Sequence, residues 1–95
     1  MPGIVHVLAY DIHDHRRRRR MAKLMEGRAT RVQESVFETY QTKKQVMELI
    51  RDSLPFLAPS EGDSLRVYRV CADCMRHFQT VGGERIDWES ALILH

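Results

Sequence analysis

The chain has 95 residues, of which 43% are hydrophobic, and this composition predicts one small folded domain and excludes a disordered chain. Its formal net charge is only +2, so a site for a polyanion must be a local basic patch. We expect a cytoplasmic protein with no membrane partner, because no apolar stretch is long enough to span a bilayer and the N-terminus lacks a signal-peptide pattern. In that compartment its two cysteines should stay reduced.

The first two predicted elements are a strand and a helix. Residues 4–12 (IVHVLAYDI) are β-branched and apolar, which is typical of a buried strand. Residues 14–26 have helical periodicity, with Asp14 as the N-cap. Extending the apolar stripe of this helix back by one turn reaches Arg17 and Arg18. At least one of these two side chains should therefore pack beside the sheet, with its guanidinium group at the strand end.

Five consecutive arginines, Arg16 to Arg20, open this helix. Successive helical residues are about 100° apart, so the five side chains cannot all face one partner. Their mutual repulsion and the opposing helix dipole cost roughly a few tenths of a kcal/mol per residue. Phosphate would make the arrangement favourable, because backbone amides at a helix start and forked guanidinium groups both bind it. The run therefore predicts nucleic-acid phosphate as a partner, ahead of a solvated basic face.

The rest of the chain contains further strands and one more helix. Residues 30–41 (TRVQESVFETYQ) contain no Gly or Pro, and their periodicity predicts one long strand. A capping-box pattern begins a second helix at Thr42, and residues 64–70 (SLRVYRV) form a clear third strand. Residues 77–83 are a candidate short strand. The apolar run within 88–95 indicates a terminal strand that pairs with a sheet edge of this chain or of another copy.

The order of these elements predicts an α/β fold with helices packed on a sheet. One uninterrupted strand at 30–41 implies a parallel, flavodoxin-like sheet. A fold-back near Glu34 and Ser35 instead implies the β-α-β-β-α-β arrangement of the ferredoxin-like unit. The residue pattern alone leaves both topologies open.

Asp11 is the candidate metal ligand, at the end of the first strand and close to the first helix. Ligands gather beyond the carboxyl ends of strands in α/β sheets, and a carboxylate there suits a hard divalent cation. One carboxylate is a weak site for Mg²⁺, so this interpretation needs one Asp from each of two chains, together with substrate phosphates. The alternative is a loop aspartate that caps a turn.

Cys71 and Cys74 form a C-x-x-C motif. Two thiolates are half of a tetrahedral zinc site, for which His77 could supply a third ligand. The motif follows a predicted strand, which also keeps open a redox-active dithiol. We favour a third interpretation, two structural thiols.

Four sequence blocks together resemble one known family. They are LAYDIHDHRRRRRMAKLMEG, TRVQESVFETY, DSLRVYRVCADC and the VGG that follows. From about Ile4 to Gly83 the chain is similar in motif order and spacing to the CRISPR-associated protein two family. These proteins are the small dimeric subunits of the spacer-acquisition machinery.

The resemblance implies an α/β (α+β) fold, a ferredoxin-like β-α-β-β-α-β sandwich with an extra C-terminal strand, in one domain over residues 1–95. It therefore favours the fold-back within residues 30–41. It also implies a homodimer in which residues 84–95 pack on the partner subunit.

The resemblance further implies roles for individual residues. Asp11 matches the family's catalytic, metal-binding aspartate, which would hold Mg²⁺ or Mn²⁺, and Tyr10 precedes it as the family pattern expects. Arg18, Arg20, Arg31, Ser35 and Phe37 fall at positions similar to the family's substrate-side or site-lining residues. The arginine run is denser than is usual in the family, and Arg16, Arg17 and Arg19 would strengthen phosphate binding.

Three functions are compatible with these residues. The first is a metal-dependent endonuclease that cuts RNA or DNA at Asp11. The second is a non-catalytic scaffold, in which the dimer binds duplex DNA or single-stranded RNA by its phosphates and bridges copies of the CRISPR integrase partner protein. The third is a toxin-like endoribonuclease outside CRISPR, since toxin proteins share this small fold.

Overall fold

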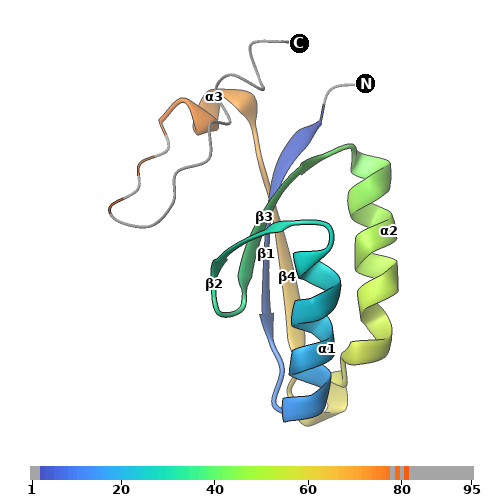
Figure 1. Ribbon diagram of the computed structural model, residues 1–95. Coiled ribbons are helices and arrows are strands. Elements are labelled where there is room, and N and C mark those ends of the chain that lie inside the picture. The colour runs from blue at the N-terminus through green and yellow to red at the C-terminus, as the bar shows by residue number, and fades with distance from the viewer. Residues whose placement is uncertain (1–2, 78, 80, 82–95) are drawn as a thin grey trace.

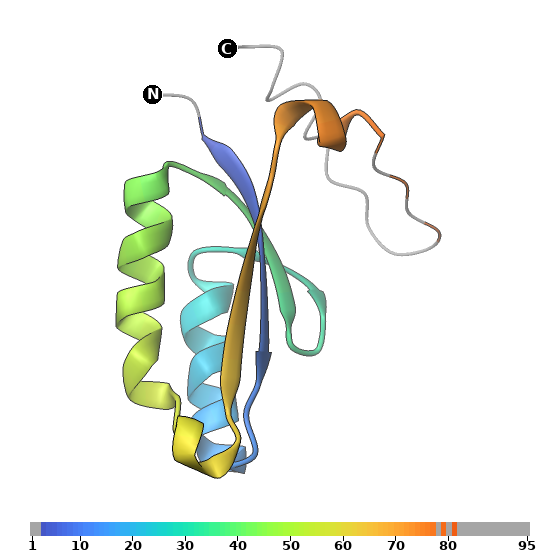
Figure 2. The same cartoon turned by 180° about the vertical axis from the view of Figure 1, so that it is seen from behind.

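Antiparallel strands form a sheet in this chain, and α1 and α2 pack on the same face of it (Figures 1 and 2). The computed structural model describes residues 3–77, 79 and 81. The elements are β1 (Ile4–Asp11), α1 (His15–Glu26), β2 (Thr30–Gln33), β3 (Val36–Gln41), α2 (Lys43–Ser53), η1 (Leu54–Phe56), η2 (Pro59–Glu61), β4 (Ser64–Val70) and α3 (Ala72–Met75). The four strands lie in the order β2-β3-β1-β4, which confirms the ferredoxin-like β-α-β-β-α-β fold.

The prediction of one long strand at residues 30–41 is wrong. β2 and β3 form an antiparallel hairpin that turns at Glu34 and Ser35, with a register irregularity between Arg31 and Gln33. The backbone N–H of Tyr10 donates a hydrogen bond to the Ser35 carbonyl at 3.1 Å, which ties the turn to β1. Periodicity missed the turn because neither Gly nor Pro marks it. The fold-back implied by the family resemblance is therefore confirmed.

Both long helices begin where the sequence predicts. The Asp14 carboxylate accepts a hydrogen bond from the Arg17 backbone N–H at 2.9 Å, so Asp14 is the N-cap of α1. Thr42 and Gln45 form the reciprocal hydrogen bonds of a capping box at the start of α2. These caps are local interactions within three residues, which is why sequence alone identifies them.

The core lies between the sheet and the two helices. Side chains of β1 alternate between the two faces of the sheet, so Leu8 and Tyr10 point towards the helices and their neighbours Val7, Ala9 and Asp11 point away. The core cluster consists of Leu8, Tyr10, Ile12, Met21, Met25, Phe37 and Leu49. Full burial of each large apolar side chain contributes about 1.5–3 kcal/mol, so this cluster fixes α1 and α2 on the sheet.

Neither α1 nor α2 packs on the opposite face of the sheet, called the open face below (Figure 2). Strand pairing places Val7, Glu38 and Tyr68 side by side on it, with Ala9 and Val36 in the next row. Tyr68 is 52% exposed. This face is therefore a sheet surface of mixed apolar and charged character.

Two predictions concern the C-terminal part of the chain. The candidate strand at 77–83 lies partly, and the terminal strand at 84–95 wholly, outside the described residues.

Among the residues that the structure does describe, none of the helices has the length and apolarity to cross a membrane.

Candidate nucleic-acid interface

Three of the predicted arginines converge on a cavity of about 440 Å³ beside α1 and the β2–β3 turn, called the arginine cavity below. It is lined by Tyr10, His15, Arg18, Arg19, Ala22, Arg31, Glu34 and Ser35. The fold therefore brings Arg31 of β2 to the same cavity as two arginines of α1. Tyr10 and Ser35, both predicted as site-lining residues, also lie in its wall.

An aromatic stack supports the arginine cavity. Phe37 is fully buried, and its ring stacks with that of Tyr10 at a centroid distance of 6.1 Å and an interplanar angle of 22°. The Arg31 guanidinium group lies 5.4 Å from the centroid of Phe37, and it pairs with the Glu26 carboxylate at 3.4 Å. Phe37 thus acts from beneath the cavity, by holding Tyr10 and Arg31 in place.

Tyr10 presents a protonated hydroxyl group in this wall. Burial raises its pKa, although the neighbouring Arg31 acts in the opposite direction. The hydroxyl donates a hydrogen bond to the Glu34 carbonyl at 3.4 Å. At neutral pH, Tyr10 is therefore a neutral donor beside three cations.

His15 separates two of the arginines. Its Nδ1 atom lies 3.1 Å from the guanidinium group of Arg18, and its Nε2 atom lies 2.7 Å from that of Arg19. A neutral imidazole accepts a hydrogen bond at only one nitrogen, and arginine only donates. One of the two contacts therefore lacks an acceptor. An anion in the cavity would supply one, which makes the geometry favourable for phosphate.

The prediction that at least one of Arg17 and Arg18 lies beside the sheet, with its guanidinium group at the strand end, is confirmed. Arg18 donates to the Ile12 carbonyl at 3.1 Å, at the end of β1. Arg17 turns towards the loop before β4, where its guanidinium group pairs with Asp63 at 3.0 Å and with Glu61 at 3.3 Å. Arg17 is consequently engaged within the fold and does not line the arginine cavity.

Sequence reasoning missed Asp63, which organises the strand ends. Its side chain is inaccessible and accepts three hydrogen bonds at 3.0 Å, from the His13 and Ala58 backbone N–H groups and from Arg17. The His13 hydrogen bond leads the interactions that hold its pKa below the ordinary value. Asp63 thereby joins the β1–α1 loop to the loop before β4. Its position directly before a strand that pairs with β1 is a signal, but only once the sheet order is known.

Gly62 allows this connection. Its backbone has a φ of +90°, in the left-handed region that favours glycine. A Cβ atom there would lie 3.2 Å from Nε2 of His13. The glycine therefore permits the close approach of the two loops that Asp63 joins.

We predict that Asp63→Asn lowers the melting temperature by on the order of 5 °C at neutral pH, because Arg17 loses its buried anionic partner. The folded-state pKa of Asp63 lies below the ordinary 3.8, so its contribution is present above that value and is lost as the pH falls through the lowered one. The difference between variant and wild type should therefore shrink in acid. Thermal unfolding from pH 7 to pH 3 measures both effects. Asp73→Asn, at an exposed carboxylate, is the control, and equal melting of Asp63→Asn and wild type at pH 7 would contradict the assignment.

Asp11 and two of the arginines lie away from the arginine cavity. Asp11 is exposed and points to the open face by strand alternation, whereas its neighbour Tyr10 lines the cavity on the other face. Arg16 and Arg20 are exposed on α1 and are absent from the cavity lining. Within one chain, the candidate metal ligand Asp11 and the arginine cavity therefore lie on opposite faces of the sheet.

The chemistry of Asp11 suits half of a magnesium site. No group of three His, Cys, Asp or Glu side chains within the described residues could hold a metal ion. Magnesium retains several waters and needs only one or two carboxylates with substrate phosphates. An exposed carboxylate at a strand end offers such oxygen ligands, and a second copy of the chain would supply the other.

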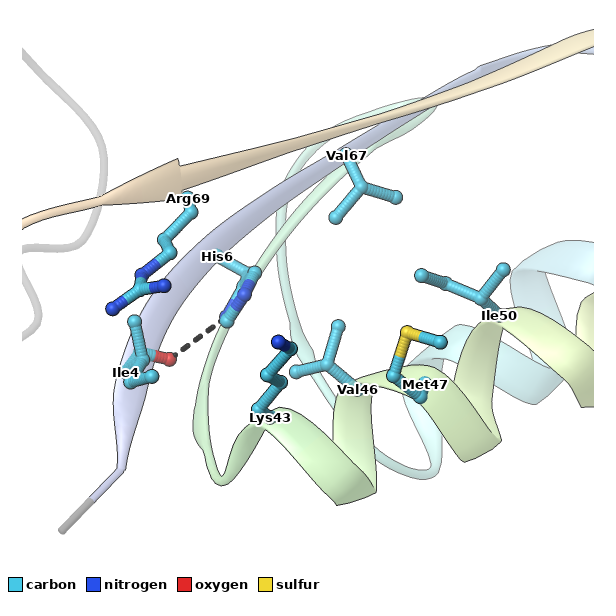
Figure 3. A pocket seen from close by; sticks show the side chains of 8 residues that line it. All are labelled: Ile4, His6, Lys43, Val46, Met47, Ile50, Val67 and Arg69. Carbon is cyan, nitrogen blue, oxygen red and sulfur yellow. Dashed lines mark hydrogen bonds between the residues drawn. The ribbon is translucent and has the colours of Figure 1, made fainter.

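A second cavity, of about 200 Å³, lies between α2 and the β1 and β4 strands (Figure 3). The lining side chains of Val46, Met47 and Ile50 come from α2 and face Val67 of β4. Lys43 and Arg69 also line it. None of the predicted site residues is part of this cavity.

The structure places both cysteines at the surface. Cys71 and Cys74 are free and exposed, and their interpretation as two structural thiols stays a prediction. Their Sγ atoms lie 3.0 Å apart at the start of α3. They also form no metal-ligand group with His77 among the residues that the structure describes.

Comparison with known proteins identifies the family. Residues 4–78 match the family model described as CRISPR associated protein Cas2. The chain belongs to the Cas2 family. This match covers most of the 95 residues and confirms the resemblance drawn from the sequence blocks.

Individual proteins and solved structures are also similar to this chain. The chain is 38% identical over 84 residues to the CRISPR-associated endoribonuclease Cas2 1 of Chloroflexus aurantiacus, covering 81% of this chain and 83% of the relative. The crystal structure of Streptococcus pyogenes Cas2 at pH 6.5 superposes with a TM-score of 0.69 at 26% identity, over 82% of this chain and 99% of that one. The structure of hypothetical protein TT1823 from Thermus thermophilus has a TM-score of 0.68 at 36% identity, over 74% and 84% of the two chains.

Proposed function

We propose that this Cas2-family chain acts in CRISPR adaptation, in the cytoplasm, as a homodimer that binds nucleic acid through its phosphates and bridges the integrase partner protein. The convergence of Arg18, Arg19 and Arg31 on one cavity carries the proposal. We further propose a Mg²⁺- or Mn²⁺-dependent phosphodiesterase activity at Asp11, on RNA or DNA. Its relative in Chloroflexus aurantiacus is named an endoribonuclease, which supports this second activity.

The arginine cavity supports recognition of phosphate rather than of bases. Guanidinium groups bind phosphate oxygens through paired N–H donors, and the Tyr10 hydroxyl and Ser35 add neutral polar groups. Contacts of this kind position a duplex without reading its sequence. We therefore expect binding that is insensitive to sequence and steeply dependent on salt.

The open face supports the homodimer. It carries Val7, Val36 and Tyr68 on the side of the sheet that α1 and α2 leave uncovered. Packing two such faces together would bury these side chains. It would also give Asp11, at the end of the same face, a second copy nearby, as a shared metal site requires.

The metal at Asp11 would supply Lewis-acid stabilisation of the scissile phosphate when bound. Asp11 contributes a carboxylate that is exposed and reachable by a polynucleotide. The arginines of the same dimer neutralise phosphate charge and hold the strand in place.

We predict that Val7→Asp combined with Val36→Asp converts the dimer to a monomer, because it places four carboxylates in the interface of the assembled pair. Sedimentation velocity measures the change in oligomeric state. Val32→Asp, on the exposed strand β2, is the control and should leave the dimer intact. A dimer that survives the Val7 and Val36 substitutions would exclude the open face as the interface.

Reconstituted integration tests the adaptation function directly. The wild-type chain and its integrase partner are incubated with a short DNA duplex and a plasmid that carries a repeat array. We expect integration at the repeat only when both proteins are present. Equal integration without this chain would contradict the proposal.

A further inference from the structure

Cys71 and Cys74 line neither the arginine cavity nor the cavity beside α2. Cys71 directly follows β4 and is the N-cap of α3, and Cys74 lies within this single-turn helix. Both thiols are exposed to solvent, and their sulfur atoms are in hydrogen-bond contact at 3.0 Å. Only a small movement is therefore needed to bring them to bonding distance.

The two sulfur atoms have different environments. The two sulfur atoms are in hydrogen-bond contact with each other at 3.0 Å, and Cys71 Sγ also accepts a hydrogen bond from the Cys74 backbone N–H at 3.3 Å. These hydrogen bonds stabilise the Cys71 thiolate and lower its pKa, while the same contact raises the pKa of Cys74. The carboxylate of Asp73 disfavours both thiolates, but it pairs with Arg76 at 3.4 Å. Cys71 is thus the attacking thiol and Cys74 the one that follows.

We propose that Cys71 and Cys74 form a reactive dithiol that reduces low-molecular-weight disulfides, such as oxidised glutathione, and closes to an intramolecular disulfide. The Cys71 thiolate attacks one sulfur of the external disulfide, whose S–S bond breaks, and the departing thiolate takes a proton from water. Cys74 then loses its proton and attacks Cys71 Sγ, which releases the second small thiol. The cysteine pair loses two electrons, and the external disulfide gains them as it becomes two thiols.

The consequence for the fold is local. The bond would fix the α3 turn against the end of β4, which is an edge strand of the sheet that the described residues form. Disulfides in a reducing compartment are usually transient and redox-sensing, which fits an exposed pair rather than a buried one.

The test uses the reduced, full-length protein and oxidised glutathione, with acid quenching, alkylation and mass spectrometry. We expect the wild type to lose two hydrogen atoms and to retain no glutathione. Cys74→Ser should accumulate a glutathione adduct on Cys71. Cys71→Ser should react more slowly at Cys74, because Cys71 in the Cys74→Ser variant keeps its hydrogen bond from the backbone N–H of residue 74.

Unfolding the two single variants in urea provides the control, because their rates should then become equal. Three outcomes would overturn the proposal. They are equal folded rates for the single variants, a wild type that keeps the glutathione adduct without closing, and a purified protein whose thiols hold zinc and do not react. The readout involves no nucleic acid, so it is independent of the proposed function.

Discussion

Replacing Arg18, Arg19 and Arg31 together with glutamine is expected to weaken duplex DNA binding at least about tenfold and to flatten its salt dependence. A plot of the logarithm of the binding constant against the logarithm of salt concentration should become shallower, its slope falling in magnitude by about 0.9 for each phosphate contact removed. The three side chains line one cavity, and no charge pair with the buried Asp63 is broken. Fluorescence anisotropy of a labelled duplex at several salt concentrations measures both quantities.

The matched control removes three cations from α2, as Lys43→Gln, Lys44→Gln and Arg51→Gln. These residues are exposed and remote in sequence from the residues that line the arginine cavity. Because each triple variant removes three positive charges, the change in net charge is the same. Equal weakening by both triple variants would show that overall charge, and not the cavity, drives binding. Arg17 is left intact in each variant because its substitution would disturb the contact with Asp63.

Asp11→Asn is expected to lower Mg²⁺-dependent cleavage at least about a hundredfold while leaving duplex binding unchanged. The substitution keeps the shape of the side chain but removes the charge that holds a hard cation. Asp11 lies on the face opposite the arginine cavity, so phosphate binding should persist. Cleavage of labelled RNA and duplex DNA across a Mg²⁺ titration, beside binding in metal-free buffer, measures the two effects.

Glu48→Gln on α2 is the control for loss of one carboxylate, and it should cleave as the wild type does. Wild-type cleavage by Asp11→Asn would place the activity at another site. A pure wild-type preparation that cleaves neither substrate would remove the phosphodiesterase from the proposal, while the predictions for DNA binding and integration would stand.

Features set by neighbouring residues could be predicted from the sequence. Asp14 and Thr42 start their helices through hydrogen bonds to residues three positions on, so the motif is visible in the chain. The apolar stripe of α1 likewise indicated that at least one of Arg17 and Arg18 packs towards the sheet. Each of these predictions needs only helical geometry.

Features set by tertiary contacts could not be predicted from the residue pattern alone. The turn at Glu34 and Ser35 has no local marker, and it is stabilised by a hydrogen bond from Tyr10, which is distant in sequence. Asp63 meets Arg17 across 46 positions of the chain, so neither residue signals the other. The Tyr10 and Asp11 side chains lie on opposite faces of the sheet because successive residues of a strand alternate between the faces. Their adjacency in the sequence instead suggested a single site.

The opposite orientations of Tyr10 and Asp11 have a consequence for how such a protein can evolve. Under the proposed function, binding of a polynucleotide would depend on one side of the sheet, and its cleavage would depend on the other. A lineage that lost the carboxylate would still bind DNA, and one that lost the guanidinium groups would keep its carboxylate. Selection could then change or remove either activity without altering the other.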